Sequence, residues 1–151
     1  MAQYSVADRT ASVTTAVVLA EVRTAATERI YITEIGVSVG VAGASPTIGL
    51  IRRNALGITP TSPKLGQARD PADAVSVSSS AVAWGTPPTL PGTPIYLRRV
   101  TLPAQLGAGW VWTFPFGSEL VVPVSDAILL NMVAISSAVA TAIDFYFVWR
   151  E

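Results

Sequence analysis

The sequence predicts an all-β fold, an antiparallel β-sandwich for which a jelly roll is the preferred topology. Apolar residues recur at every second position in extended segments, which is the period of a β-strand. About ten short segments rich in Val, Ile, Thr and aromatic residues are separated by turns, in which most of the 11 glycines and 11 prolines fall. No segment has clear signals for the start and the stop of a helix. A length of 151 residues favours a single domain that spans residues 1–151.

The first two strands are predicted at residues 2–8 and 13–22. A helix over residues 13–27 is the alternative, because Leu19 and Glu21 are good helix formers. Val17, Val18 and their β-branched neighbours lose side-chain freedom in a helix, so the strand is preferred.

The third strand, residues 31–41, has the clearest alternation in the chain. Its odd positions from Tyr31 to Val41 are apolar or threonine, whereas its even positions include Glu34 and Ser38. One face of this strand is therefore expected in the core. Gly36 lies in the middle of the strand and predicts a bulge or a bend near it.

The remaining strands are predicted at residues 47–54, 75–83, 94–101, 109–114, 119–124, 127–135 and 142–150. The stretch between Asp126 and Asp144 has no charged residue, but it is slightly too short to span a membrane and contains Asn131. Two buried strands joined by a hairpin explain it better. The N-terminus lacks the features of a secretory signal peptide, and no membrane contact is expected.

Two long loops interrupt the predicted strands. The first runs from Asn54 to Ala74 and the second from Gly85 to Pro94, and their prolines cannot donate hydrogen bonds to a sheet. Long loops often carry binding contacts, so the first is expected to contact a partner. For the second loop, contact and simple connection stay equally open. The segment from Gly107 to Gly109 lacks the context of a phosphate-binding motif and predicts a tight turn.

The residue types that the chain lacks exclude many catalytic sites. Without cysteine and histidine, the chain cannot form a disulfide, a Ser-His-Asp triad or a zinc site with Cys or His ligands. Its ten basic and ten acidic residues cancel, so the overall positive charge typical of nucleic-acid binding is missing. We therefore expect no catalytic residue, no cofactor, no metal and no nucleic-acid partner.

A glycosidase that works with two carboxylates is the remaining enzymatic alternative. Asp70 and Asp73, in the sequence Asp-Pro-Ala-Asp, are the one local pair. Aspartate side chains commonly accept hydrogen bonds from the backbone of their own turn, so this pair is expected to form a turn rather than an active site.

Arginine supplies nine of the ten basic side chains, in part as the adjacent pairs 52–53 and 98–99. Neighbours on a strand point to opposite faces, so one member of each pair is expected at a strand end, an edge or an interface. Arginine is favoured where a charge is partly desolvated against protein, so interface or intrachain pairing is preferred over phosphate binding.

Two stripes of alternating aromatic residues are expected in the core, with a sugar-stacking platform as the alternative. Trp84 stands beside the second loop and is the better candidate for an exposed contact. The stripes are Trp110, Trp112 and Phe114, and Phe145, Phe147 and Trp149. The side chains expected at an interface are Arg52, Arg53, Lys64, Arg69, Asp70, Asp73, Trp84, Arg98 and Arg99.

Several blocks of residues after position 28 resemble small structural proteins of tailed bacteriophages. The blocks are RIYITEIG (29–36), GITPTSP (57–63), DPAD (70–73), AWGT (83–86), RRVTLPA (98–104), LGAGWVWTF (106–114), LVVP (120–123) and DFYFVWRE (144–151). They cover most of the chain after residue 28, and none is a catalytic signature.

The resemblance implies a virion component, above all a capsid decoration (cement) protein that forms a homotrimer and binds the major capsid protein on the head surface. A tail- or fibre-associated virion protein and a lectin-like glycan-binding module are the alternatives. Charged residues make up 13% of the chain, about half of the roughly 25% that is usual. This low charge agrees with a surface that packs against other protein and with a non-enzymatic role.

Overall fold

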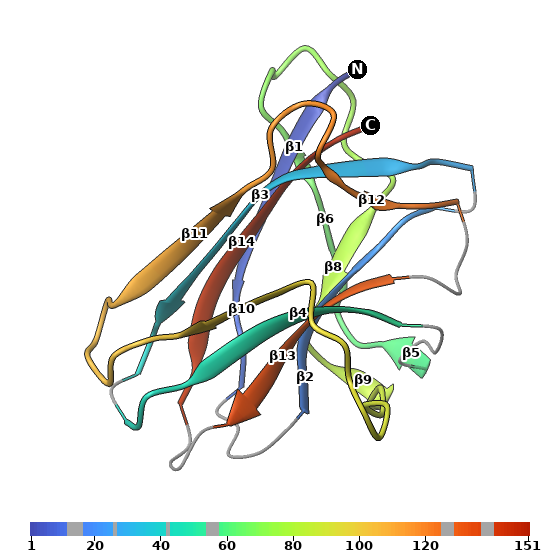
Figure 1. The fold of residues 1–151 in the computed structure, drawn as a ribbon. Coiled ribbons are helices and arrows are strands. Elements are labelled where there is room, and N and C mark those ends of the chain that lie inside the picture. Colours follow the sequence, from blue (N-terminus) through green and yellow to red (C-terminus); the bar gives the residue numbers. More distant parts are fainter. Residues whose placement is uncertain (12–16, 26, 42, 54–57, 125–128, 137–140) are drawn as a thin grey trace.

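The described part of the chain consists of strands, turns and irregular segments (Figure 1). The computed structural model describes residues 1–11, 17–25, 27–41, 43–53, 58–124, 129–136 and 141–151. No helix occurs among them, and hence none that is long and apolar enough to cross a membrane. The predicted all-β class is confirmed.

One six-stranded antiparallel sheet, called sheet 1 below, has the order β11-β3-β14-β1-β7, with β12 also paired to β3. Its centre is β14, which pairs along its whole length with β3 and β1. The strands are β1 (Gln3–Arg9), β3 (Ile30–Val39), β7 (Gln67–Ala68), β11 (Gly109–Thr113), β12 (Leu120–Val122) and β14 (Ile143–Arg150).

A second six-stranded antiparallel sheet, sheet 2, has the order β10-β4-β13-β2-β8-β6. A separate two-stranded sheet joins β5 (Ile58–Pro60) to β9 (Trp84–Thr86). The strands of sheet 2 are β2 (Val17–Arg23), β4 (Thr47–Arg53), β6 (Lys64–Leu65), β8 (Ser79–Ala81), β10 (Arg98–Thr101) and β13 (Leu129–Ser136).

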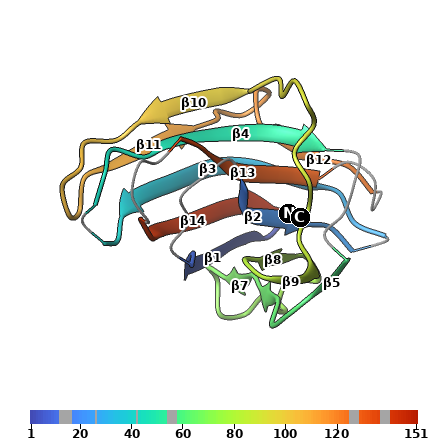
Figure 2. The same ribbon diagram turned by 90° about the horizontal axis from the view of Figure 1, so that it is seen from below.

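The main hydrophobic core contains side chains from both large sheets, which form two layers in Figures 1 and 2. Ile35 and Phe147 enter it from sheet 1, and Leu50 and Met132 enter it from sheet 2. Each is a member of an alternating series, so the step of two in the sequence places one face of each strand in the core. Burial of these faces is the main favourable contribution to folding.

The strand expected over residues 31–41 is present as β3, which ends at Val39, and its bulge lies three residues before Gly36 rather than at the glycine itself. Gly36 pairs in regular register with Val111 and Tyr146. The register shifts where Val148 faces Glu34 and Trp149 faces Ile32, which leaves one extra residue in β3 at position 33. The glycine itself is therefore not the bulged residue, and it leaves room for the ring of Tyr146 instead.

The two strands around the uncharged stretch are confirmed as β13 and β14, but the hairpin is wrong. β13 belongs to sheet 2 and β14 to sheet 1, so the chain passes from one sheet to the other between them. Residues 17–22 form a strand and not the alternative helix. Residues 13–16 and 127–128 of the predicted strands lie outside the described residues.

The first predicted loop is wrong in part, because residues 58–74 contain the short strands β5, β6 and β7. Residues 54–57 of that loop lie outside the described residues. In the other direction, the strands expected at residues 75–83 and 94–101 shrink to β8 and β10. Ser76, Ser78 and Ser80 point inward and are buried, whereas Val75 and Val77 are exposed. In this segment the serines therefore face the interior and the valines face solvent, which is the reverse of what their hydrophobicity predicts.

Candidate functional site

An open groove of about 790 Å³ lies over the outer face of sheet 1. Gly36, Ser38, Val111 and Tyr146 belong to this face, because they alternate with residues of the core along β3, β11 and β14. Gly36 and Ser38 have small side chains, so the middle of this face is recessed. The complete lining is Ala7, Asp8, Gly36, Val37, Ser38, Gly109, Trp110, Val111, Asp144, Phe145 and Tyr146.

The ring of Tyr146 lies across Gly36, its partner on the neighbouring strand. A Cβ atom at position 36 would lie 2.0 Å from Cε1 of the tyrosine and 2.4 Å from its Cζ, so only glycine allows this position of the ring. The Tyr146 hydroxyl donates a hydrogen bond to Oε1 of Glu34, with an O–O distance of 2.7 Å. One ring face thus covers the backbone, and the other faces the groove.

The hydrogen bond to Glu34, with a further contribution from burial, raises the pKa of Tyr146 to about 12. An unfolded tyrosine has a pKa of about 10, so the folded state holds this proton more tightly. The resulting stabilisation is fully present below pH 10 or so and is lost as the pH rises through about 12.

We therefore expect Tyr146 to ionise well above the pH at which an ordinary tyrosine does. The difference in tyrosinate absorbance between the wild type and Tyr146→Phe isolates this group during an alkaline titration. Glu34→Gln is the matched control, because it keeps an acceptor but removes the negative charge, and it is expected to lower the pKa of Tyr146. A difference curve with its midpoint near the usual tyrosine value would contradict the expected hydrogen bond.

An ion pair between Arg9 and Asp144 lies at the other end of the groove. Nε and Nη2 of Arg9 donate to the two carboxylate oxygens, and the Nη2–Oδ2 distance is 2.8 Å. These hydrogen bonds, together with the positive charge of Arg9, lower the pKa of Asp144. Gly40 leaves the space for this carboxylate, since a Cβ there would lie 2.9 Å from Asp144 Oδ2.

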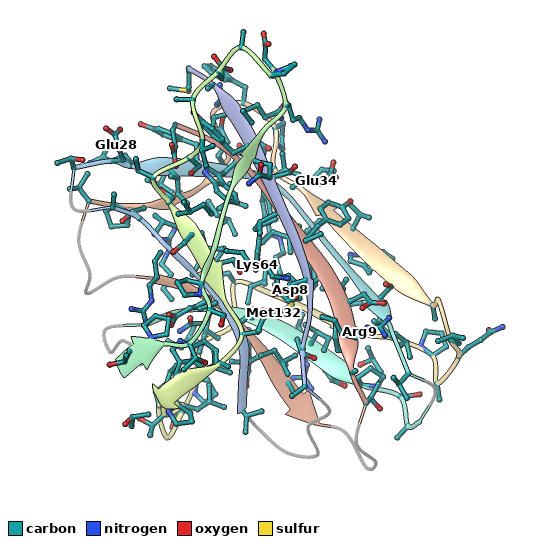
Figure 3. The ribbon with its side chains drawn as sticks, turned by 180° about the vertical axis from the view of Figure 1, so that it is seen from behind. Asp8, Arg9, Glu28, Glu34, Lys64 and Met132 are labelled. Carbon is teal, nitrogen blue, oxygen red and sulfur yellow. The ribbon has the colours of Figure 1, made fainter. Side chains whose placement is uncertain are left out.

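Lys64 belongs to a second ion pair near this sheet, with Asp8 as its partner. Its Nζ atom lies 2.7 Å from Oδ1 of Asp8, and Figure 3 shows the two side chains between neighbouring strands. Both ion pairs are balanced in charge. The surroundings of the groove are therefore polar at the ends and close to electrically neutral.

Trp84 does not form the exposed contact that its position beside a loop suggested. It is half-buried and packs with Leu90 and Tyr96 on the buried residues Val18, Ile51 and Val133. Its indole N–H donates to Glu21 Oε1 at 2.9 Å. The tryptophan thus covers the outer face of sheet 2 and stabilises a buried carboxylate.

One member of each arginine pair, Arg52 and Arg98, makes a contact within the chain. Arg52 lies at the end of β4 and donates to the carbonyl oxygen of Val121 in the other sheet, at 2.5 Å. Arg98 lies over the ring of Phe114, 5.7 Å from its centre, and Arg99 is exposed beside it on the edge strand β10. The side chain of Arg53 lies outside what the structure describes. The expected position at strand ends or edges is confirmed for 52, 98 and 99.

Asp70 forms the turn that the sequence suggested. Its Oδ1 accepts a hydrogen bond from the N–H of Ala72 at 2.9 Å, and its carbonyl oxygen accepts one from the N–H of Asp73 at 3.0 Å. Arg69 and Asp73 are exposed in the same segment. Of the nine side chains expected at an interface, the eight that the structure describes are spread over sheet 2, the two-stranded sheet and the turn after β7, and they do not gather at one site.

Five of the six residues in the aromatic stripes are buried, as expected, and one is not. Trp110 is 51% exposed although its neighbours Trp112 and Phe114 are buried. It lies near the start of β11, an edge strand that pairs only with β3 among the described residues. Alternation in the sequence indicates the face of a strand, but it does not indicate where the opposite sheet ends.

No protein-family model, no curated protein and no solved structure matches the chain. Within the described ranges, no group of three or more acidic residues is arranged to hold a metal ion. The groove contains Tyr146 and Ser38, two residues that the sequence alone did not single out. Their signal is a glycine in an alternating strand, which marks a place where a side chain from the next strand comes close.

Proposed function

We propose that the chain is a non-enzymatic virion protein of a tailed bacteriophage, a capsid decoration protein that forms a homotrimer and binds major capsid subunits. The sequence resemblance supports a role in the virion and a location on the capsid. The observation that carries self-association is a pair of exposed apolar patches on opposite sides of the molecule. A tail- or fibre-associated protein is the alternative location.

The strand order supports a jelly-roll sandwich. Four strands of sheet 1 run in the order β1-β14-β3-β11, and four strands of sheet 2 run in the order β2-β13-β4-β10. Of the seven steps between these eight strands along the chain, only the one from β4 to β10 stays within a sheet. Two four-stranded antiparallel sheets connected in this way are typical of jelly rolls, which are common in viral capsid proteins.

The first patch, called the β11 patch, wraps around the free edge of β11 and consists of Leu106, Trp110 and Val111, which are 66%, 51% and 49% exposed. As neighbours on the strand, Trp110 and Val111 point to opposite faces of the sheet on either side of this edge. β11 has one free edge among the described residues and carries no charge and no proline in its sequence Gly-Trp-Val-Trp-Thr. Natural proteins usually protect such edges with charges, prolines or bulges, because an open edge invites pairing with another chain. An edge without this protection favours a role in association.

The second patch, called the β6 patch, consists of Leu65, Val75 and Val77, which are also about half exposed. It lies around β6, at the end of sheet 2 opposite to β10. Figure 2 shows β10 and β11 along one side of the molecule and β7 along the other. The two patches are therefore different surfaces near opposite sides of the molecule.

Two different patches on opposite sides favour head-to-tail contacts, which close into a ring when the rotation between copies allows it. A two-fold contact across β10 is disfavoured, because it would bring Arg98 and Arg99 of both copies together. A trimer built from the β11 patch of one copy and the β6 patch of the next buries both surfaces.

This arrangement predicts a specific result for two charged variants. Trp110→Glu and Val77→Glu each place a charge in one patch, so each is expected to turn a trimer of 15.8 kDa chains into monomers in light scattering. A mixture of the two variants is expected to form dimers, because each supplies the patch that the other has lost. Ile95→Glu changes a side chain outside both patches, and we expect it to leave the trimer intact.

A wild-type chain that is monomeric at micromolar concentration, or variants that stay trimeric, would contradict the head-to-tail assembly.

Sedimentation together with purified capsids tests the proposed binding to major capsid subunits. Binding to mature heads but not to isolated tails is expected, and the opposite result favours the tail- or fibre-associated alternative. Binding to the mature shell alone would stabilise that state by mass action.

A further inference from the structure

We propose that the groove on the outer face of sheet 1 binds a neutral glycan, with Tyr146 as the platform for a sugar ring and the Arg9–Asp144 pair as the group that binds its hydroxyls. This inference goes beyond capsid decoration, although the β11 side of the groove shares Trp110 and Val111 with the contact proposed above. It also places the glycan site far from Trp84, which the structure shows to be packed against sheet 2.

The platform is fixed in position. The ring of Tyr146 lies over Gly36 and is held at its hydroxyl by Glu34. A tyrosine ring is flat and apolar on its face, and the face of a pyranose ring with its C–H groups is flat and apolar as well. A ring that is already in place loses little conformational freedom when a sugar stacks on it.

The hydroxyl-binding group lies at a suitable distance along the same strand. Asp144 and Tyr146 are two residues apart on β14, so both point to the outer face, with about 7 Å between their Cα atoms. Arg9 and Asp144 are 57% and 39% exposed, so each keeps donors or acceptors that the ion pair does not use. An adjacent donor and acceptor match two neighbouring hydroxyls of one sugar.

Charge and backbone pairing favour a glycan over other polymers. The cations Arg9 and Lys64 are paired with Asp144 and Asp8, so the groove has no excess positive charge for a nucleic acid or an acidic polysaccharide. β3 and β14 are each paired on both sides, so a peptide cannot add to the floor of the groove as a further strand. A neutral chain of sugars needs neither feature.

The groove is also open and long enough for more than one sugar. Its residues come from four neighbouring strands, β1, β14, β3 and β11, and its volume is about 790 Å³. In Figure 3, Arg9 and Glu34 mark positions toward opposite ends of this face. An oligosaccharide is therefore a better match than a single sugar.

The test uses the full chain and a panel of neutral hexasaccharides of glucose, mannose, galactose and N-acetylglucosamine, measured by calorimetry. At least one member is expected to bind and to change the fluorescence of Trp110, which lines the groove. Tyr146→Ala is expected to weaken that binding by about tenfold or more, because the stacking surface is lost. Tyr146→Phe keeps the ring and is expected to stay within about threefold of the wild type.

Two further variants separate the site from general effects on the fold. Asp144→Asn keeps the shape of the side chain but breaks the ion pair, and we expect binding to weaken by about threefold to tenfold. Val75→Ser lies in the β6 patch and is expected to bind like the wild type. Thermal unfolding of each variant shows whether it is folded, and the Phe and Asn substitutions test the site even if Tyr146→Ala is unstable.

Four results would overturn the proposal: no binding by any member of the panel, equal binding by Tyr146→Ala and wild type, binding only of an anionic polymer such as heparin, or conversion of an oligomer to monomers by Tyr146→Ala. The last result would mean that a second copy of the chain covers the groove. A monomeric wild type, in contrast, contradicts the assembly proposed above but leaves glycan binding as expected.

Discussion

Trp149→Ala is expected to lower the free energy of unfolding by about 3–5 kcal/mol, as truncation of a large aromatic residue in a core usually does. Trp149 is fully buried and stacks on Tyr4, with 6.3 Å between the ring centres. Gly66 lies against the indole so closely that a Cβ there would be 2.3 Å from the ring. The indole N–H donates to Glu151 at 3.1 Å, so the substitution also removes a hydrogen bond.

Trp110→Ala is the matched control, because it removes the same atoms from a position that is half exposed. At a protein concentration low enough to dissociate the trimer proposed above, little cavity forms at this site, and we expect a loss below about 1 kcal/mol. Urea denaturation followed by circular dichroism measures both variants. Domains of ordinary stability unfold with about 5–15 kcal/mol, so Trp149→Ala removes a large share. Equal losses in the two variants would show that Trp110 is buried in solution, for example in an assembly.

The strand pattern of the sequence was sufficient to predict the class of the fold and most of its core. Alternation in residues 31–41 and 142–150 depends only on which face of a strand is buried, and this is a local property. Pairing is not local. Nothing in the apolar stretch from β13 to β14 tells whether the second strand returns beside the first or crosses to the other sheet, so the predicted hairpin was wrong.

The candidate site was less predictable for the same reason. Gly36 in an alternating strand predicted a bulge or a bend nearby, but what the glycine does in the fold depends on Tyr146, 110 positions further along the chain. Trp84 was expected to be exposed but is half-buried, because Leu90 and Tyr96 pack beside it on sheet 2. Trp110 was expected in the core but is half exposed, because it lies on an edge strand. Asp70 was predicted correctly, since the turn it forms involves only its own neighbours.

Removal of the cation beside the buried carboxylate of Glu21 is expected to have the second large effect on the free energy of unfolding. Glu21 is fully buried in sheet 2, and its Oε1 accepts hydrogen bonds from Nε of Arg23 and from the indole of Trp84. Its Oε2 has no hydrogen-bond partner among the described residues, and neither has the side chain of Asn131, which faces it on β13. The negative charge is therefore compensated chiefly by one arginine.

Arg23→Met is expected to destabilise the fold by about 3–5 kcal/mol at neutral pH, because it leaves the charge of Glu21 buried without its cation. Methionine keeps much of the apolar volume of the arginine side chain, so loss of packing contributes little. Urea denaturation measures the loss. Arg99→Met, on the exposed edge strand, is the matched control and is expected to change stability by less than about 0.5 kcal/mol.

The double variant Glu21→Gln/Arg23→Met distinguishes charge from packing. Glutamine keeps an acceptor for the indole N–H of Trp84 but carries no charge, so the reason for the loss disappears. The double variant is therefore expected to be more stable than Arg23→Met alone, with a coupling energy of about 1–3 kcal/mol. If the two substitutions simply add, Arg23 acts through packing, and the buried carboxylate is compensated by another group.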